Sequence, residues 1–341
     1  MMTIDIYTHF VPARYADALE RQTSGVHPDA GRIGDLGKMF PNLLECDARL
    51  AHMDKYGVSL QVLTPLPLPV EQFMTERDER RVCELVRLAN DSMAEIVARR
   101  PDRFVAVALL AFQEIGLAVE ELVRAVRELS MKGAMLFTNI NGRPLDWPEL
   151  FPLYEKAVEL DVPLWVHPVS WNYYGWIRDF LLWQIFGWPF DTTLATARLV
   201  YSGVLEKFPR LKLITHHSGG VMPYLSERIR DIHDQTEEFR ALYSEENVEA
   251  SGQPSVRRHP LDVFRMFYTD VALSGSLPAL RCSYAFFGAG QLVFGTDYPF
   301  SPEQGERFIR ANLAAVNSLE ITTGERTRIL VENAKELLHL S

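Results

Sequence analysis

Short apolar runs alternate along the chain with longer segments in which apolar residues recur at helical spacing. Segments of the second kind predict helices, for example 47–56, which Gly57 closes, and 75–100, which ends before Pro101. Strands that alternate with helices predict a parallel sheet, and eight such units predict a (β/α)8 TIM barrel of the α/β class, with insertions. The eight runs that predict strands are 3–9, 58–63, 104–110, 133–137, 163–167, 212–215, 265–270 and 291–294.

Three stretches do not fit the regular alternation. Residues 27–44 are rich in glycine and proline and predict a long loop, which in a barrel is usually functional or mobile. Residues 171–190 form an aromatic-rich insertion; we expect a dimer contact or core packing there, with one or two rings lining a pocket. A helix is expected over 221–243, followed by a polar, mobile stretch over 244–259.

Composition limits the class of protein without naming a function. The 341 residues are 47% hydrophobic and 23% charged, which suits one large globular domain over 1–341. The net charge of -10 argues against a nucleic-acid or anionic-membrane surface. Three scattered cysteines predict no disulfide framework and favour a cytoplasmic protein. We see no signal peptide and no run of about 18 apolar residues that would span a membrane.

Four metal-capable side chains lie at or just beyond the ends of predicted strands. They are His9, His167, His217 and Asp297. In a parallel barrel the carboxyl ends of the strands share one face, where active sites lie. Imidazoles and a carboxylate that converge there would suit Zn²⁺ or a similar divalent ion. His216 and His217 are neighbours on an extended segment, so we expect only one of them to face the centre.

Five motifs, in this order, resemble the amidohydrolase superfamily, and within it the branch of aminocarboxymuconate semialdehyde decarboxylase-like proteins. The resemblance spans nearly the whole chain and implies an amidohydrolase-like barrel. The motifs are Asp5-Ile-Tyr-Thr-His9, the segment 49–58, Trp165-Val-His167-Pro168, His217-Ser-Gly-Gly220 followed by Pro223, Tyr224 and Arg228, and Phe294-Gly-Thr-Asp297-Tyr-Pro299.

The resemblance implies roles for individual residues. His9, His167 and Asp297 match metal-binding positions, and His217 matches the histidine that activates the metal-bound water. Asp297 is the second candidate catalytic group. The match also selects His217 over His216, which we then expect to be a hydrogen-bonded packing residue. Two arginines match positions that hold substrate carboxylates, the second of them across a homodimer interface: Arg49 and Arg228.

Tyr7 departs from the family pattern, in which the first strand ends in His-x-His or Glu-x-His. Tyr7 and His9 are two positions apart, so both should point into the site. A phenol with a pKa of about 10 is a reluctant ligand at neutral pH. The metal could bind through His9, His167 and Asp297 with Tyr7 as a hydrogen-bonding, substrate-binding or doubtful metal-binding group. It could also bind more weakly, or be absent.

These residues favour a metal-dependent, non-oxidative decarboxylase of a small unsaturated or aromatic carboxylic acid. The expected cofactor is a divalent metal, Zn²⁺ first and Mn²⁺ as the alternative, and the expected assembly is a homodimer. The alternative is a hydrolase of a lactone, ester or cyclic amide on the same site, which could be metal-independent. Hydration of a double bond and an inactive barrel that has lost its metal remain further alternatives.

Overall fold

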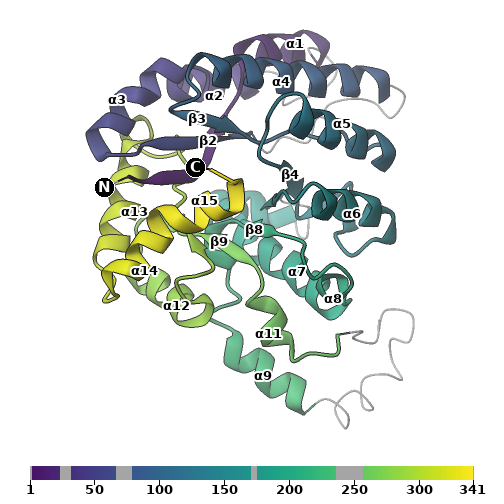
Figure 1. Cartoon of the computed structure of the whole chain (residues 1–341), viewed down its shortest axis with the longest axis vertical. Helices are drawn as coiled ribbons and strands as arrows, with labels where there is room; N and C mark the ends of the chain where they lie inside the picture. Colours follow the sequence, from purple (N-terminus) through teal and green to yellow (C-terminus); the bar gives the residue numbers. More distant parts are fainter. Residues whose placement is uncertain (1, 24–31, 67–78, 170–174, 236–255, 341) are drawn as a thin grey trace.

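The computed structural model describes residues 2–23, 32–66, 79–169, 175–235 and 256–340. Strands occupy the centre of the molecule and helices surround them (Figure 1). Among the described helices, none combines the length and the apolar composition that a bilayer crossing requires.

Each of the eight predicted strand regions contains a strand. Parallel ladders join them in the orders β1-β2-β3 and β4-β7-β8-β9-β10. A separate antiparallel hairpin, β5 (Asn139–Ile140) with β6 (Arg143–Pro144), was not predicted. The central strands are β1 (Ile4–Phe10), β2 (Leu60–Pro65), β3 (Phe104–Ala106), β4 (Ala134–Phe137), β7 (Leu164–His167), β8 (Leu213–Thr215), β9 (Tyr268–Asp270) and β10 (Leu292–Val293).

Backbone hydrogen bonds join the two ladders at both seams. Between β3 and β4, the N–H of Met135 donates to the carbonyl of Ala108 over 2.8 Å. Between β1 and β10, the N–H of Ile6 donates to the carbonyl of Phe294 over 2.9 Å, and Thr8 forms a parallel bridge with Tyr298. The strands therefore follow one another around a TIM barrel, and the last strand lies beside the first.

Helices cover the outside of the strands. The predicted helix 47–56 is α3, and Gly57 ends it in the left-handed region at φ 68°. The helical elements of the described residues are α1 (Ala13–Thr23), α2 (Arg32–Met39), α3 (Cys46–Tyr56), α4 (Glu79–Arg99), α5 (Ile115–Arg127), α6 (Phe151–Glu159), η4 (Gly175–Leu181), η5 (Trp183–Gly187), α7 (Trp188–Tyr201), α8 (Val204–Lys207), η6 (His217–Gly219), α9 (Ser226–Asp234), α11 (Pro260–Phe264), α12 (Leu277–Phe287), α13 (Glu306–Asn317), α14 (Thr323–Thr327), η8 (Arg328–Glu332) and α15 (Asn333–Leu338), with short turns at Pro41–Leu43, Pro148–Leu150 and Glu303–Gly305.

The prediction of a loop over 27–44 is wrong where the structure describes it. Residues 32–39 form α2, because Ile33 and Leu36 recur at helical spacing and pack against the core together with Phe40. The prediction missed this helix because glycines are interspersed in the stretch and favoured a loop. Residues 24–31 lie outside the described part, as do 236–255, which include the end of the predicted helix 221–243 and most of the polar stretch 244–259.

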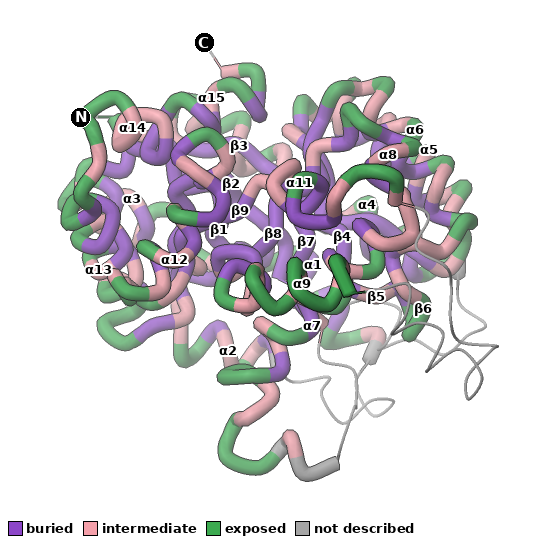
Figure 2. Tube along the Cα trace, turned by 90° about the horizontal axis from the view of Figure 1, so that it is seen from below, coloured by how far each residue is buried: buried purple, intermediate pink, exposed green. Residues whose placement is uncertain are grey.

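The core fills the barrel and the layer between strands and helices. All residues of β1, β2, β4 and β7 are buried, as expected for parallel strands covered on both faces. Buried positions concentrate along the strands and exposed ones on the outer helices (Figure 2). Trp165 crosses the interior, where its indole N–H donates to the carbonyl of Ile6 over 3.0 Å. The barrel is therefore a packed core with its chemistry confined to one end.

Asp5 fastens the seam between the first and last strands. Its carboxylate accepts from the N–H of Thr296 at 3.0 Å and from the hydroxyl of Thr296 at 2.6 Å. Burial raises the pKa of Asp5 to about 7, against the lowering effect of these hydrogen bonds. A carboxyl whose pKa is raised on folding stabilises the fold below its unfolded pKa of about 4, and this contribution is lost as the pH rises to about 7.

Replacing Asp5 by Asn should therefore change how stability depends on pH. Asn keeps an oxygen acceptor for the N–H of Thr296 but cannot ionise. We expect the free energy of unfolding of the Asp5→Asn variant, relative to that of the unmodified protein, to increase between pH 4.5 and pH 8. Urea unfolding at both pH values measures this, with the exposed Asp102→Asn variant as the charge control. A relative stability that does not change with pH would contradict the role given to Asp5.

Candidate functional site

The first strand brings two of the predicted site residues to the carboxyl end of the barrel. The pairing of β1 with β2 shifts register between Asp5 and Thr8, as it does at a β-bulge. Bulges re-aim side chains and are frequent beside active sites. Here the rings of Tyr7 and His9 lie 5.7 Å apart between centroids, so both reach the same region, as predicted from their spacing.

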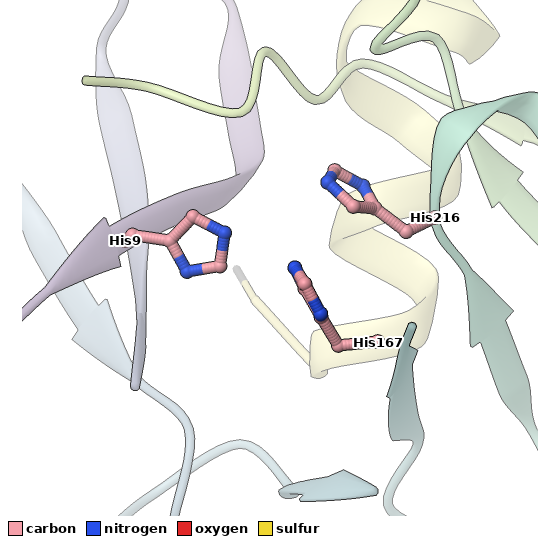
Figure 3. Close-up of side chains that lie close together, drawn as sticks. All are labelled: His9, His167 and His216. Carbon is pink, nitrogen blue, oxygen red and sulfur yellow. The ribbon is translucent and has the colours of Figure 1, made fainter. Parts of the chain in front are cut away.

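Three buried histidines meet at this end of the barrel. His9 comes from β1, His167 from the end of β7, and His216 from the residue after β8. One ring nitrogen of each lies within 4.8 Å of the others. The three rings face a common space between the strand ends (Figure 3). Separations of this size are compatible with ligands of a single metal ion, whose bonds to nitrogen and oxygen are about 2.0–2.2 Å long.

Hydrogen bonds set the orientation of all three rings. Nδ1 of His9 faces the carbonyl of Pro65 at 3.3 Å, and Nδ1 of His167 faces the carbonyl of Pro168 at 2.7 Å. Nδ1 of His216 forms a short hydrogen bond with the carboxylate of Asp270. Since a carbonyl or carboxylate oxygen only accepts, each Nδ1 must carry the proton. In the neutral rings the lone pair is therefore on Nε2.

Asp297 brings a carboxylate to the same place. Its Oδ1 lies 3.2 Å from Nε2 of His9 and 3.4 Å from Nε2 of His216. The chain holds it there through the N–H of Asp297, which donates to the carbonyl of Tyr7 over 3.0 Å. Burial alone would raise the pKa of Asp297, but the neighbouring rings of His216 and His9 outweigh it and hold the pKa well below its usual range. Asp297 is therefore an anion at neutral pH.

Both His216 and His217 reach the site, so the expectation that only one of them faces the centre is wrong. Atoms of His216, His217 and Asp297 form a second group within 4.8 Å. The physical reason is that the strand has already ended: His217 and Ser218 have φ values of 55° and 53°, and the alternation of an extended chain no longer applies.

The sequence pattern did not single out Asp270, although it ends a predicted strand as His9 does. It binds His216, and its Oδ1 accepts from the N–H groups of Ser218 at 3.2 Å and Ala272 at 3.0 Å. Burial lowers the pKa of His216, but the charge of Asp270 and then that of Asp297 raise it to about 9. Two carboxylates around one buried imidazole make this place favourable to positive charge.

His217 lies closer to solvent than the three buried histidines. Its Nδ1 is buried and has no hydrogen-bond partner among the described residues. Burial and the neighbouring His216 lower the pKa of His217 to about 3, so it is neutral at pH 7. The ring of Trp188 stacks beside it at 6.2 Å between centroids and 16° between planes. One aromatic residue of the 171–190 insertion therefore lines the site; residues 170–174 lie outside the described part.

The donor set fits a divalent metal. Ring nitrogens of His9, His167 and His216 and the carboxylate of Asp297 converge in a buried space that favours positive charge. Without a metal ion the protonated ring of His216 supplies that charge, and a divalent cation would take the place of its proton. The second carboxylate, Asp270, orients one imidazole from behind, as outer-shell carboxylates do in metal sites.

The sequence of this chain matches a known protein family over almost its whole length. The family model described as "Amidohydrolase" matches residues 4–340. The chain belongs to the amidohydrolase family. This confirms the resemblance seen in the sequence and the TIM-barrel class.

Relatives within the amidohydrolase family have decarboxylase names. The chain is 31% identical to gamma-resorcylate decarboxylase of Rhizobium over 86% of this chain and 87% of that protein. It is 27% identical to 2-amino-3-carboxymuconate-6-semialdehyde decarboxylase of Dictyostelium discoideum over 99% and 92%. A dihydroxybenzoic acid decarboxylase from Polaromonas, with bound manganese and the inhibitor 2-nitroresorcinol, matches with a TM-score of 0.76 and 26% identity over 99% and 97%.

Tyr7, the departure from the amidohydrolase pattern, lies flat against His216. The ring centroids are 3.9 Å apart and the planes differ by 14°. Its hydroxyl donates to Sδ of Met135 on β4 over 3.8 Å. Burial, together with the charges of Asp270 and Asp297, raises the pKa of Tyr7 well above its usual value. The phenol therefore stays protonated at neutral pH.

Arg49 of α3 is fully buried below the site and has protein partners. Its Nε donates to the carbonyl of Asn42 over 2.8 Å, and another nitrogen forms a short hydrogen bond with the carbonyl of His9. The guanidinium also lies 5.0 Å from the ring centroids of Phe10 and Tyr298. These contacts support a brace for the end of β1 more than the substrate-carboxylate contact expected from the amidohydrolase resemblance.

Arg228 of α9 is exposed on the outer surface of this chain, and α9 lies at the end of the molecule away from β1 and β2 (Figure 1). A site role for Arg228 would therefore need a partner subunit, as the resemblance implies, and it stays a prediction.

The two roles of Arg49 can be separated by experiment. Arg49→Met keeps much of the volume but removes the donors to Asn42 and His9. If Arg49 is a brace, urea unfolding should show a loss of about 3 kcal/mol, since buried acceptors are left without partners, and Arg49→Lys should recover part of it. If Arg49 instead binds the substrate carboxylate, Arg49→Met would keep its stability while KM increases, and the bracing role would be wrong.

Proposed function

We propose that this protein is a metal-dependent, non-oxidative decarboxylase of a small hydroxylated aromatic carboxylic acid. The observation that carries the proposal is the convergence of His9, His167, His216 and Asp297 at the carboxyl end of an amidohydrolase barrel. The names of the relatives, which include gamma-resorcylate decarboxylase, support aromatic acids as the substrate class.

His9, His167 and Asp297 would hold the metal. We infer Mn²⁺ rather than the Zn²⁺ first expected, because manganese is bound in the Polaromonas decarboxylase and a carboxylate is a hard ligand that suits it. When bound, the metal supplies a Lewis acid that polarises oxygen atoms of the substrate.

The residues of the chain supply positioning and proton transfer. Trp188, whose ring stacks on His217, gives the site an aromatic wall suited to a planar substrate. His217, near solvent, relays a proton from an acid in the solvent, such as hydronium or a protonated buffer, to the carbon that bears the carboxylate. The lowered pKa of its imidazole makes the transient imidazolium a strong proton donor. The electrons of the breaking C–C bond form the new C–H bond, and CO2 leaves without oxidation or reduction. Asp297, ionised beside His9, stabilises the positive charge that the transfer places on His217.

We infer a homodimer that is formed through an exposed apolar surface, named here the 180–194 surface. It consists of Phe180, Leu181, Ile185, Phe186, Phe190 and Leu194, all exposed in the single chain. Apolar side chains gathered in one region usually mark an interface. Helix α9, which carries Arg228, contacts α11, and α11 contacts α7, which carries Phe190 and Leu194 of the 180–194 surface. A partner's Arg228 could therefore reach a substrate carboxylate.

We also infer a single domain over 1–341, because one connected core extends from Ile4 to Leu338. A reducing cytoplasmic setting is in keeping with Cys46, Cys83 and Cys282, which are free thiols in the structure.

Release of CO2 from a panel of hydroxybenzoates and a muconate semialdehyde tests the activity. We expect turnover that is lost after dialysis against a chelator and restored by Mn²⁺ more fully than by Zn²⁺. His217→Ala should lower kcat by roughly 100-fold or more, the usual size of a lost general acid–base group. Hydrolysis of lactones without CO2 release from any acid, or full turnover after chelation, would overturn the proposal.

The dimer is tested by Ile185→Asp, which places a charge on the 180–194 surface. Sedimentation velocity should show a dimer for the unmodified protein and a monomer for the variant. Met2→Asp, at an exposed apolar residue before β1, serves as the control and should stay dimeric. Arg228→Ala should keep the dimer but raise KM by roughly tenfold or more, the cost of a lost charged hydrogen bond. A monomeric unmodified protein with full activity would contradict the shared site.

A further inference from the structure

We propose that His216 is the ligand that replaces the missing first-strand donor, so that His9, His167, His216 and Asp297 hold the metal while Tyr7 does not. This inference rests on the proposed metal dependence and deepens it. The family pattern places a histidine or glutamate at the position of Tyr7, and the chain has no such group there.

The position of His216 supports ligation. It is fully buried, and one of its ring nitrogens lies within 4.8 Å of those of His9 and His167. Nε2 of His216 is 3.4 Å from the same carboxylate oxygen of Asp297 that Nε2 of His9 approaches to 3.2 Å. Adjacent ligands of one ion are about 3–3.5 Å apart when bonds are 2.0–2.2 Å long. Asp297 and the two histidines therefore have separations suited to one coordination sphere.

The other nitrogen of His216 is already committed. Nδ1 binds Asp270, which fixes the tautomer and leaves Nε2 directed into the site. Nε2 itself is buried without a hydrogen bond among the described residues. An imidazole that is held by a carboxylate on one nitrogen and directs the other toward a second carboxylate, 3.4 Å away, has the arrangement of a metal-ligating histidine.

Tyr7 packs against the ring of His216 and does not bind the metal itself. Its ring covers a face of the His216 imidazole at 3.9 Å, and its hydroxyl is engaged by the sulfur of Met135 on another strand. A residue at position 7 with a shorter ligating side chain would leave that face uncovered. The tyrosine and His216 therefore form one unit: the first supports the ring of the second, which supplies the donor atom.

His217 is assigned outside the coordination set. It lies closer to solvent than His216 does. One side of its ring contacts His216, which in turn contacts Tyr7, and it also stacks on Trp188. This leaves it available for proton transfer. Of the two adjacent histidines, His216 thus binds the metal and His217 carries out the acid–base chemistry.

Metal affinity, measured on metal-stripped protein by titration calorimetry with Mn²⁺, tests the assignment. His216→Ala should weaken binding by about 100-fold or more, beyond the 10–100-fold cost of losing an outer-shell partner. Two matched controls should stay within about threefold of the unmodified affinity: His217→Ala, which removes the neighbouring imidazole, and Tyr7→Phe, which removes only the hydroxyl.

A double variant that moves the imidazole from position 216 to position 7 gives a second test. Tyr7→His, combined with His216→Ala, returns an imidazole to the first strand and should regain at least about tenfold of the lost affinity, as ligand exchange between the two positions requires. Circular dichroism and urea unfolding of the metal-free variants establish that each is folded.

Anomalous diffraction from crystals of the unmodified protein soaked in Mn²⁺ gives a readout that needs no variant. An ion within about 2.5 Å of Nε2 of His216 supports the assignment. An ion more than about 3.5 Å from it, full affinity of His216→Ala, or a large loss in Tyr7→Phe would overturn it. If the unmodified protein binds no divalent metal, the proposed function fails as well. If it binds the metal but the His216→Ala variant binds it equally tightly, this inference alone fails.

Discussion

The structure of the site depends on one electrostatic constraint: several electron-rich atoms are directed into a single buried space. The Nδ1–H groups of three histidines donate hydrogen bonds to the carbonyls of Pro65 and Pro168 and to the carboxylate of Asp270, so the remaining nitrogen of each ring points inward. With an added carboxylate, such an arrangement in a low-dielectric interior is favourable only around positive charge. The raised pKa of His216 is the response of one imidazole to this concentration of negative potential.

The sequence predicted the barrel and the main site positions because both depend on strand ends. A run of buried residues that stops at a polar side chain is visible without coordinates, and His9, His167 and Asp297 were found in this way. His216 and Asp270 were underestimated for different reasons. The left-handed backbone at His217 and Ser218 brings the ring of His217 to the site beside that of His216, and no pattern of hydrophobicity encodes such a turn. Asp270 satisfied the same rule as the others but had no motif to single it out.

Arg49 and Tyr7 show where a family motif needs a structure to interpret it. Arg49 sits in a matching segment, yet its guanidinium is surrounded by backbone carbonyls and two aromatic rings, which is the environment of a structural arginine. Tyr7 departs from the motif, yet its ring is integrated into the packing against His216. Identity at a position is therefore a weaker guide to role than the partners of the side chain, which depend on residues far away in the sequence.

The joining of β1 to β10 has a consequence for the way the protein is made. Asp5 and Thr296, which fasten that seam, are 291 positions apart, and the seam is also where His9 meets Asp297. Contacts between such distant positions close a long loop of the chain, and they are slow to appear. A polypeptide still emerging from the ribosome holds the histidine for most of its synthesis without the aspartate beside it. The candidate site is thus among the last features to assemble, because it needs side chains from both the first and the last strand of the barrel.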